Sequence, residues 1–453
     1  MTGELVPGWK TSTLGEVRQF QRGLTYSRSD EVEQSSNVVP RAMNIDLSSH
    51  LLDFSDLKYI SDEVVVPDGK KVRKGSLMVC TASGSKSHLG RIAFIDDDYD
   101  YAFGGFMGML TPSNELVPKY LFHLMTSEAY EDFIAALADG MNINNPKFDD
   151  LRQFRVPFPP LPEQQRIVDI LDEAFPAVSI ARENAEKNLR DARALFKGDL
   201  RSVVAEAWEA GELVALSSLA TDITDGDHMP PPKAPTGVPF ITIRNVMKDT
   251  GEIDFSETFM APREYYEGLK GNKKPRKGDV LYAVTGSFGI PVLVERDVEF
   301  FFQRHIALAR PKPETDSAWL YYLQMSPQVF DQADERATGT AQRTASPGVL
   351  RSLAVPAVPL PQQRAAAARL EILTQESQRL AAIYERKLAA LDELKKSLLH
   401  QAFAGKLQDK GSHHGQLGSL RAAAGPSRVE RGRSEMVLPV SYTHLTLPTT
   451  ERV

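Results

Sequence analysis

The residues best suited to chemistry in this chain are basic side chains beside small hydroxyl residues, next to two similar strand-like runs. Lys74 lies just before the run 76–81, and a polar loop follows that run. Lys274 and Lys277 hold the same place before the run 279–285. Such side chains grip phosphates, and small residues let a loop approach base edges. A single charged run is usually a solvated face, but two at matching places favour a nucleic-acid contact.

The candidate DNA contacts are chosen by their position in such loops. In the first half of the chain they are Arg22, Lys74, Ser83, Ser85, Lys86, Arg91, Asn142, Asn144 and Lys147. In the second half they are Lys274, Lys277, Ser287, Arg304, Thr340 and Arg343. The formal net charge of −7 argues weakly against nucleic acid as a partner. Whole-chain charge nevertheless says little about a local cleft.

Each enzymatic motif in the chain lacks a necessary part. Gly84–Ser87 has the lysine of a phosphate-binding loop one place late and lacks the leading glycine. Asn145–Phe148 is similar to the adenine-gripping motif of amino-methyltransferases but lacks its second proline. A zinc site needs clustered cysteine or histidine, and the chain has one cysteine and nine scattered histidines. The acidic run Asp96–Asp100 suits a solvated turn better than a metal. We therefore expect no catalytic group, metal or cofactor in this chain.

Composition places the chain among ordinary globular proteins with room for two or three domains. It has 453 residues, of which 42% are hydrophobic and 25% charged. The single cysteine, Cys80, excludes an intrachain disulfide and suits a reducing compartment. Met1–Lys10 has no apolar core of a signal peptide, and no 18-residue apolar run occurs. These features predict a cytoplasmic protein with no membrane contact.

Two long helical runs position everything else. Leu161–Glu209 and Pro361–Phe403 each follow a proline-rich stretch, and Pro162 suits the first turn of a helix. The second run has apolar residues on alternating three- and four-residue steps, whereas the first has an alanine-rich seam. These seams predict that the two helices pack together as an antiparallel coiled coil. The alternative is two surface helices that lie on separate domains.

The segments before each helical run repeat one plan, so the order is globule, helix, globule, helix. Each globule is predicted to be strand-rich, with a helix near its end, at 118–138 in the first and 317–333 in the second. The predicted fold class is α+β. The predicted boundaries are 1–160 and 211–359 for the globules, 161–210 and 360–407 for the helices, and 408–453 for a disordered tail. Within that tail, 437–453 has no counterpart in the first repeat, and we exclude it as a candidate non-native end.

The paired helix starts resemble those of specificity subunits from type I restriction–modification systems. The segments that carry this resemblance are the helix starts Leu161–Val168 and Leu360–Arg364, the helix end Leu398–Leu407, and the first segments of the two globules, Trp9–Val17 and Leu216–His228. The resemblance covers about residues 5–407. The second helix start departs from the pattern, because Gln362 stands where glutamate is usual and alanines replace the Ile-Val pair.

The resemblance implies a non-catalytic reader of double-stranded DNA. Each globule would be a target-recognition domain for one half of a bipartite, asymmetric site, with the paired helices as a ruler. About 45 helical residues rising about 1.5 Å each span roughly 65–70 Å, which is at most about 20 base pairs at about 3.4 Å each.

The same resemblance implies the partners of the chain. Two modification subunits would dock on it, and restriction subunits would join them. S-adenosylmethionine, ATP and Mg²⁺ would be held by these partners. Two alternatives stay open: a coiled-coil scaffold with paired protein-binding modules, and a self-sufficient methyltransferase or nuclease.

Overall fold

The computed structural model describes residues 7–407, except 48, 82–87, 141–147, 249, 287–288 and 340–342. The side chains of 18, 139–140 and 148–149 are likewise not described, and the predicted disordered tail 408–453 lies outside the described residues. The chain forms two compact units. The first comprises residues 1–185 and 387–453, and the second comprises residues 186–386. Each unit therefore contains one part of each long helix.

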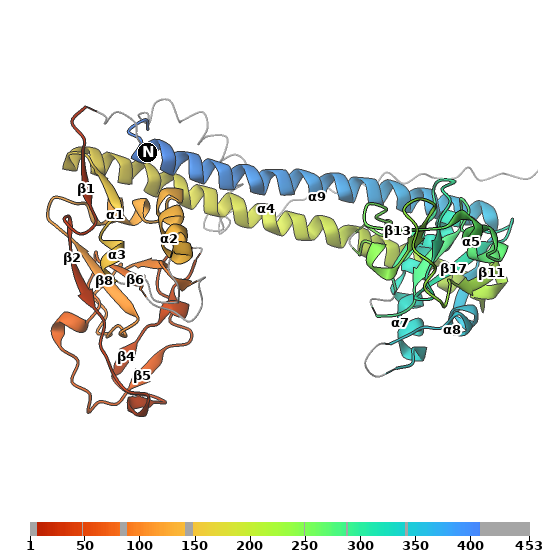
Figure 1. Ribbon diagram of the computed structural model, residues 1–453, viewed down its shortest axis with the longest axis horizontal. Coiled ribbons are helices and arrows are strands. Elements are labelled where there is room, and N and C mark those ends of the chain that lie inside the picture. Colours follow the sequence, from red (N-terminus) through yellow and green to blue (C-terminus); the bar gives the residue numbers. More distant parts are fainter. Residues whose placement is uncertain are drawn as a thin grey trace, which may run out of the picture. The chain divides into compact units, whose positions relative to one another are not determined.

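The first unit contains three small sheets (Figure 1). A two-stranded antiparallel sheet joins β1 (Lys10–Thr13) to β9 (Arg155–Phe158). A four-stranded antiparallel sheet has the order β2 (Arg18–Arg22), β8 (Met107–Pro112), β6 (Leu77–Cys80), β7 (Ile92–Phe94). A three-stranded sheet has the order β3 (Glu31–Val32), β5 (Lys58–Ile60), β4 (Asn37–Val39). The helices that follow are α1 (Pro118–Leu124), α2 (Glu128–Gly140) and α3 (Phe148–Leu151).

The second unit repeats this plan, as the sequence predicts. Its two-stranded sheet joins β10 (Glu212–Ala215) to β18 (Ala354–Ala357). Its four-stranded sheet has the order β11 (Ala220–Asp225), β17 (Ile306–Pro311), β14 (Val280–Ala283), β15 (Pro291–Leu293). A three-stranded sheet has the order β13 (Phe259–Ala261), β12 (Val238–Ile241), β16 (Phe301–Phe302). The helices are α5 (Arg263–Glu267), α6 (Ser317–Met325), α7 (Pro327–Arg336) and α8 (Pro347–Ser352).

One prediction about the globules is wrong in the same way twice. Each was expected to carry a single helix at 118–138 and 317–333, and each carries two, α1 with α2 and α6 with α7. In the second unit Ser326 caps the new helix by accepting the N–H of Val329, and Pro327 cannot continue the preceding hydrogen-bond ladder. In the first unit Ser127 Oγ donates to the Leu124 carbonyl at 2.6 Å, which ends α1.

The ends of the long helices complete the core of each unit. In the first unit the early turns of α4 (Leu161–Ala210) and the last turns of α9 (Leu360–Phe403) pack with α1. Ile167 and Leu171 of α4 are fully buried there, and Phe403 packs edge-on against Tyr120. In the second unit the roles reverse, because the last turns of α4 and the first turns of α9 join the core. The ends of the two helices therefore serve as core elements of both units.

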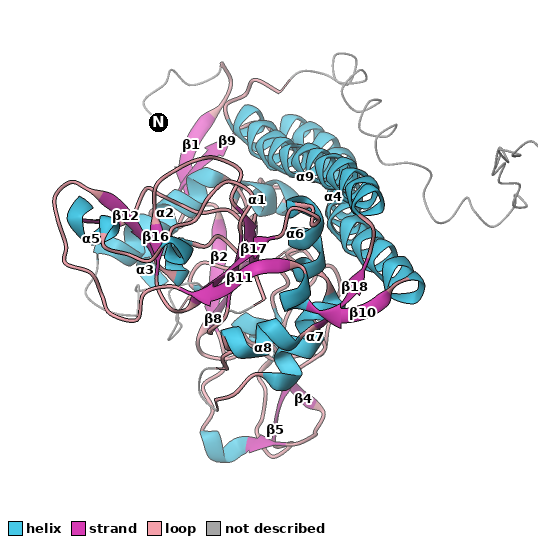
Figure 2. Ribbon diagram, turned by 90° about the vertical axis from the view of Figure 1, so that its right-hand side faces the viewer, coloured by secondary structure: helices cyan, strands magenta, loops and turns pink. Residues whose placement is uncertain are grey.

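Between their ends the helices pack on each other within each unit, as the seams predict (Figure 2). In the first unit Val178 and Ala181 of α4 lie against Leu391 of α9. In the second unit Ser377 Oγ of α9 donates to the Ala192 carbonyl of α4 at 2.8 Å. Ion pairs flank both contacts, Arg182 with Asp392 in the first unit and Arg193 with Glu385 in the second. The expected antiparallel direction is confirmed, since residue numbers rise along α4 as they fall along α9. No described helix is long and apolar enough to cross a membrane.

Candidate nucleic-acid interface

A buried glutamine at the start of each long helix joins that helix to a loop of its unit. Gln164 has no exposed area, and its Oε1 accepts the N–H of Val117 at 2.8 Å. Its Nε2 donates to the carbonyls of Glu115 at 3.0 Å and Pro159 at 2.8 Å. The side chain therefore ties the start of α4 to the loop before α1.

Gln363 makes the same three bonds at the start of α9. Its Oε1 accepts the N–H of Asp316 at 2.7 Å, and its Nε2 donates to Glu314 at 3.3 Å and Val358 at 2.6 Å. The glutamine that both helix starts share is thus a tether between a long helix and its unit. The preceding residues, Glu163 and Gln362, differ without affecting this tether.

A 3-10 turn with a buried asparagine recurs at the rim of the four-stranded sheet. In the first unit the turn is Ala42–Asn44, and Asn44 Oδ1 accepts the N–H of Arg41 at 2.9 Å while Nδ2 donates to the carbonyls of Asp53 and Asp56. In the second unit the turn is Ile243–Asn245, with the same cap onto Thr242 at 2.9 Å. Since both ends of each asparagine are bonded, the turn has a fixed shape.

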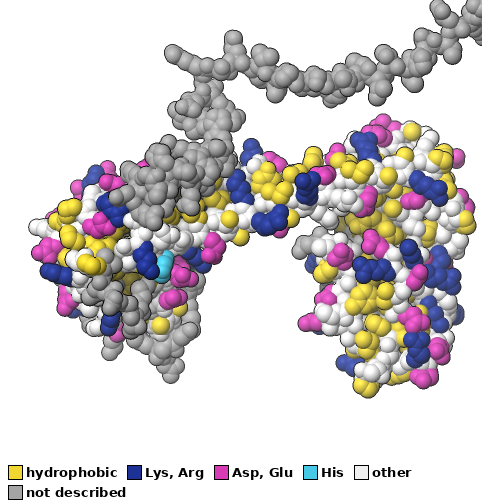
Figure 3. Space-filling view, turned by 90° about the horizontal axis from the view of Figure 1, so that it is seen from above, with side chains coloured by type: hydrophobic (Ala, Val, Ile, Leu, Met, Phe, Trp, Pro, Cys, Tyr) yellow, Lys and Arg dark blue, Asp and Glu magenta, His cyan; other side chains and the backbone are white. Residues whose placement is uncertain are grey.

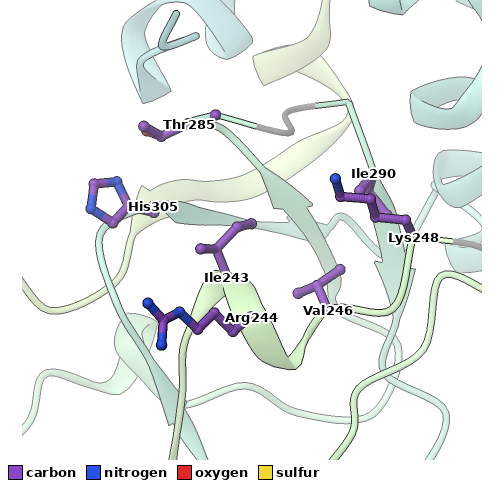
Figure 4. A pocket seen from close by; sticks show the side chains of 8 residues that line it. Ile243, Arg244, Val246, Lys248, Thr285, Ile290 and His305 are labelled. Carbon is purple, nitrogen blue, oxygen red and sulfur yellow. The ribbon is translucent and has the colours of Figure 1, made fainter. Parts of the chain in front are cut away.

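Both turns line a pocket. In the second unit the pocket has a volume of about 300 Å³ (Figure 4), and its lining is Ile243, Arg244, Val246, Lys248, Thr285, Gly286, Ile290 and His305. In the first unit the volume is about 860 Å³, and the lining is Arg22, Leu24, Thr25, Tyr26, Arg28, Glu31, Pro40, Arg41, Ala42, Met43, Lys58, His88, Gly104, Gly105, Phe106 and Met107. Three parts are common to the two linings. They are the 3-10 turn, the connection from β6 to β7 or from β14 to β15, and the residues just before β8 or β17.

A close backbone crossing beside each pocket requires glycine. A Cβ on Gly23 would lie 1.9 Å from the Gly104 carbonyl oxygen, and one on Gly226 would lie 2.0 Å from that of Phe302. Real Cβ atoms do not approach oxygen so closely, so only glycine fits at either position. Because both units have this crossing, the segment after β2 and the segment after β11 lie at equivalent positions beside their pockets.

The pockets carry basic groups whose partners differ. In the first unit Lys58 pairs with Glu31 at 2.7 Å and Arg41 pairs with Asp56 at 3.0 Å. In the second unit neither Arg244 nor Lys248 has a side-chain hydrogen bond or ion pair within the part of the chain that the structure describes. Burial lowers the pKa of His305, and the positive charge of Arg304 lowers it further, so both effects favour the neutral imidazole. Figure 3 shows Lys and Arg side chains on the second unit, interspersed with Asp and Glu.

Some of the predicted DNA contacts have partners within the protein. The N–H of Lys74 donates to Asp98 at 3.0 Å, and its Nζ lies 3.8 Å from Asp97. Lys274 donates to the Glu267 carbonyl at 3.0 Å and lies 4.8 Å from the ring centre of Tyr266. Arg343 forms an ion pair with Asp334 at 2.7 Å.

The other predicted contacts are spread over the two units. Arg22 lines the first pocket, and Arg304 is the exposed neighbour of His305 in the second. Lys277 is exposed before β14, and Arg91 is half-buried before β7. Outside the described residues lie Ser83, Ser85, Lys86, Asn142, Asn144, Lys147, Ser287 and Thr340. All fifteen residues stay predictions as DNA contacts.

The sequence predictions miss five basic residues that line the pockets, namely Arg28, Arg41, Lys58, Arg244 and Lys248. Of these, Arg41 and Arg244 belong to the two 3-10 turns. A signal existed, because Arg41–Ile45 and Thr242–Val246 share an Asn followed by a branched apolar residue at matching places in the repeat. Among the described residues, no group of three or more His, Cys, Asp or Glu could hold a metal ion.

The duplicated fold and its two basic pockets define a two-unit recognition protein, and comparison with known proteins identifies the class. Residues 7–188 and 211–385 match the family model described as the type I restriction modification DNA specificity domain. The specificity subunit of the EcoKI type I restriction enzyme of Escherichia coli K12 is 23% identical over 424 residues, covering 89% of this chain and 90% of the relative. The StySPI specificity subunit of Salmonella potsdam is 24% identical over 429 residues, with 89% and 90% covered.

Two solved structures share the fold. A chain from a type I restriction–modification system, solved in a study of its assembly and conformational transition, has a TM-score of 0.71 at 21% identity and covers 89% of this chain and 100% of its own length. The HsdS subunit of Thermoanaerobacter tengcongensis has a TM-score of 0.55 at 20% identity, with 90% and 99% covered. The chain belongs to the type I restriction–modification specificity family and is a DNA sequence-recognition subunit.

Proposed function

We propose that each unit reads one half of a bipartite, asymmetric site in double-stranded DNA. The observation that carries this proposal is the pair of pockets at equivalent places in the repeat. Each pocket is framed by a fixed 3-10 turn and bordered by basic side chains, yet the side chains differ between the units. A duplicated frame with different contact residues would read two different half-sites.

We further propose that the chain supplies no catalytic group and works in the cytoplasm within a larger complex. Two modification subunits would bind it, and restriction subunits would join them. S-adenosylmethionine, ATP and Mg²⁺ would then be held by those partners. The names of the relatives, which are specificity subunits of type I restriction enzymes, support this proposal.

The long helices would set the spacing between the half-sites. Each contributes its first turns to the core of one unit and its last turns to the core of the other. A change of length in a helix therefore acts on the connection between the units and leaves the pockets intact.

DNA binding by the full chain, alone and with its modification subunits, tests the proposal. The complex is expected to prefer one duplex sequence and to lose affinity steeply as salt rises, since phosphate contacts release counterions. Weak binding that is indifferent to sequence and flat with salt would favour a protein-binding scaffold instead. Incubating the chain alone with S-adenosylmethionine and DNA should give no methyl transfer, and transfer without partners would refute the non-catalytic role.

A further inference from the structure

Two positions in the duplicated frame carry side chains of opposite character. The middle residue of the 3-10 turn is Met43 in the first unit and Arg244 in the second. The residue just before β8 or β17 is Phe106 in the first unit and His305 in the second. Each pair lines the pocket of its own unit.

Backbone contacts establish that these positions correspond. The carbonyl of Phe106 accepts the N–H of Thr81 at 2.9 Å, and the carbonyl of His305 accepts the N–H of Val284, also at 2.9 Å. Thr81 directly follows β6 and Val284 directly follows β14, which are the matching strands. The asparagine after Met43 and the one after Arg244 make the same cap.

The frame is rigid, and the side chains it presents are exposed. Asn44 and Asn245 are 2% and 6% exposed, whereas Met43 is 54% and Phe106 is 72% exposed. Met43 on the turn and Phe106 before β8 line the same pocket, and large apolar side chains exposed together mark a contact surface. Arg244 is also exposed, and in Figure 4 its guanidinium and the His305 ring lie on the same side of the second pocket.

The chemistry of each pair matches a different base edge. A guanidinium presents two parallel donors that fit O6 and N7 of guanine. Both bonds form only if the backbone that carries the arginine is held in a fixed position. Methionine and phenylalanine offer no donor, but they pack well on the C5 methyl group of thymine. Arg28, Arg41 and Lys58 around the first pocket, and Lys248 beside the second, can hold the flanking phosphates.

We propose that these two positions read bases: Arg244, supported by His305, reads a guanine in one half-site, and Met43 with Phe106 contacts a thymine methyl group in the other. This inference rests on the proposed function and assigns which residues discriminate.

The test begins with the target sequence, obtained by sequencing the methylated positions in DNA modified by the full chain with its modification subunits. Duplexes are then made in which a single recognition group is changed, either N7 of guanine or the C5 methyl group of thymine. In them 7-deazaguanine replaces each guanine in turn, and deoxyuridine replaces each thymine. Affinities of the same complex are measured with the wild-type chain, Arg244→Ala, Met43→Ala and the control Arg296→Ala. Arg296 is exposed in the turn after β15 and lies outside the pocket lining.

For the wild type, 7-deazaguanine at one position should weaken binding, and Arg244→Ala should lose about 5- to 150-fold for the cognate duplex. The variant should no longer respond to 7-deazaguanine at that position, while Arg296→Ala responds as the wild type does. Deoxyuridine at one position of the other half-site should cost the wild type about fourfold, the value of one buried methyl group, and cost Met43→Ala nothing.

The outcomes distinguish failure of this inference from failure of the proposed function. If Arg244→Ala weakens every duplex equally and lowers the salt dependence, Arg244 holds a phosphate and the inference is overturned. If both variants keep the sensitivities of the wild type, the inference is likewise overturned, although the specific binding itself stands. A wild-type complex with no sequence preference would instead overturn the proposed function.

Discussion

Replacing Gln164 by leucine should unfold the first unit more easily and leave the second unchanged. Leucine has nearly the same volume, so the change removes three hydrogen bonds without opening a cavity. The Pro159 carbonyl loses the bond from the Gln164 side chain. The N–H of Val117 loses its acceptor, and the Glu115 carbonyl loses its donor.

The expected cost comes from the three groups that lose a partner, of which Pro159 is buried, Val117 is half-buried and Glu115 is exposed. A buried polar group left unsatisfied costs about 1–3 kcal/mol and a partly exposed one less, so the total is about 2–4 kcal/mol. With a urea m value near 2 kcal/mol/M, the midpoint of the first unit should fall by about 1–2 M. Gln164→Glu should be no milder, because its carboxylate would face the Glu115 and Pro159 carbonyls with no donor to offer.

The three tryptophans allow the units to be followed separately. Trp9 packs on the core of the first unit, whereas Trp208 and Trp319 belong to the second. Fluorescence in a chain with Trp208→Phe and Trp319→Phe reports the first unit, and a chain with Trp9→Phe reports the second. Gln165→Leu is the control, since Gln165 is exposed and its side chain bonds to Asp169 one turn away, at 2.9 Å. A Gln164→Leu midpoint no lower than that of Gln165→Leu would refute the tether.

Three further predictions address the core, acid stability and spacing. Arg310 bonds both oxygens of Asp279 at 3.0 and 2.7 Å, where the first unit has Ser76 and Thr111 with hydroxyl oxygens 3.1 Å apart. Arg310→Thr should therefore cost the second unit about 3 kcal/mol in urea unfolding, and adding Asp279→Ser should recover most of it; equal losses in both variants would contradict this. Burial, then the charge of Lys395, lowers the pKa of His50 below 6.5, against smaller opposing effects of the Ile92 backbone and Asp46. Because the unfolded chain then binds the proton more tightly, the first unit should lose stability as pH falls below about 6.5. His50→Asn, which tolerates the positive φ of 52° at this position, should flatten that loss; an unchanged pH profile would exclude His50 as its source. Finally, four residues inserted near Arg190 should change the spacer found by methylation sequencing and keep both half-sites, whereas an unchanged spacer would exclude a ruler role for α4.

Features that are local, or that repeat along the chain, could be predicted from the amino-acid sequence. A heptad step such as Leu391 to Leu398 specifies an apolar seam whatever surrounds the helix. The pairing of the helices could therefore be predicted from each helical segment alone. The repeated motif at the helix starts showed the duplication, and the duplication gave the order of the units. The family resemblance followed from the same sequence motifs.

Contacts between residues that are distant in sequence became visible only in the folded chain. The break between α6 and α7 is an exception, because the signal for it, Ser326 followed by Pro327, is local and was missed within a continuous apolar pattern. Gln164 could be seen as part of a motif, but its role needed the loop at Glu115, 49 residues earlier in the chain. Arg244 and His305 share a pocket although they are far apart in sequence, because strand pairing brings the start of β17 beside the turn. The spacing of apolar residues shows which face of a segment is buried. A binding surface depends in addition on which other segments pack beside it, and the spacing does not show this.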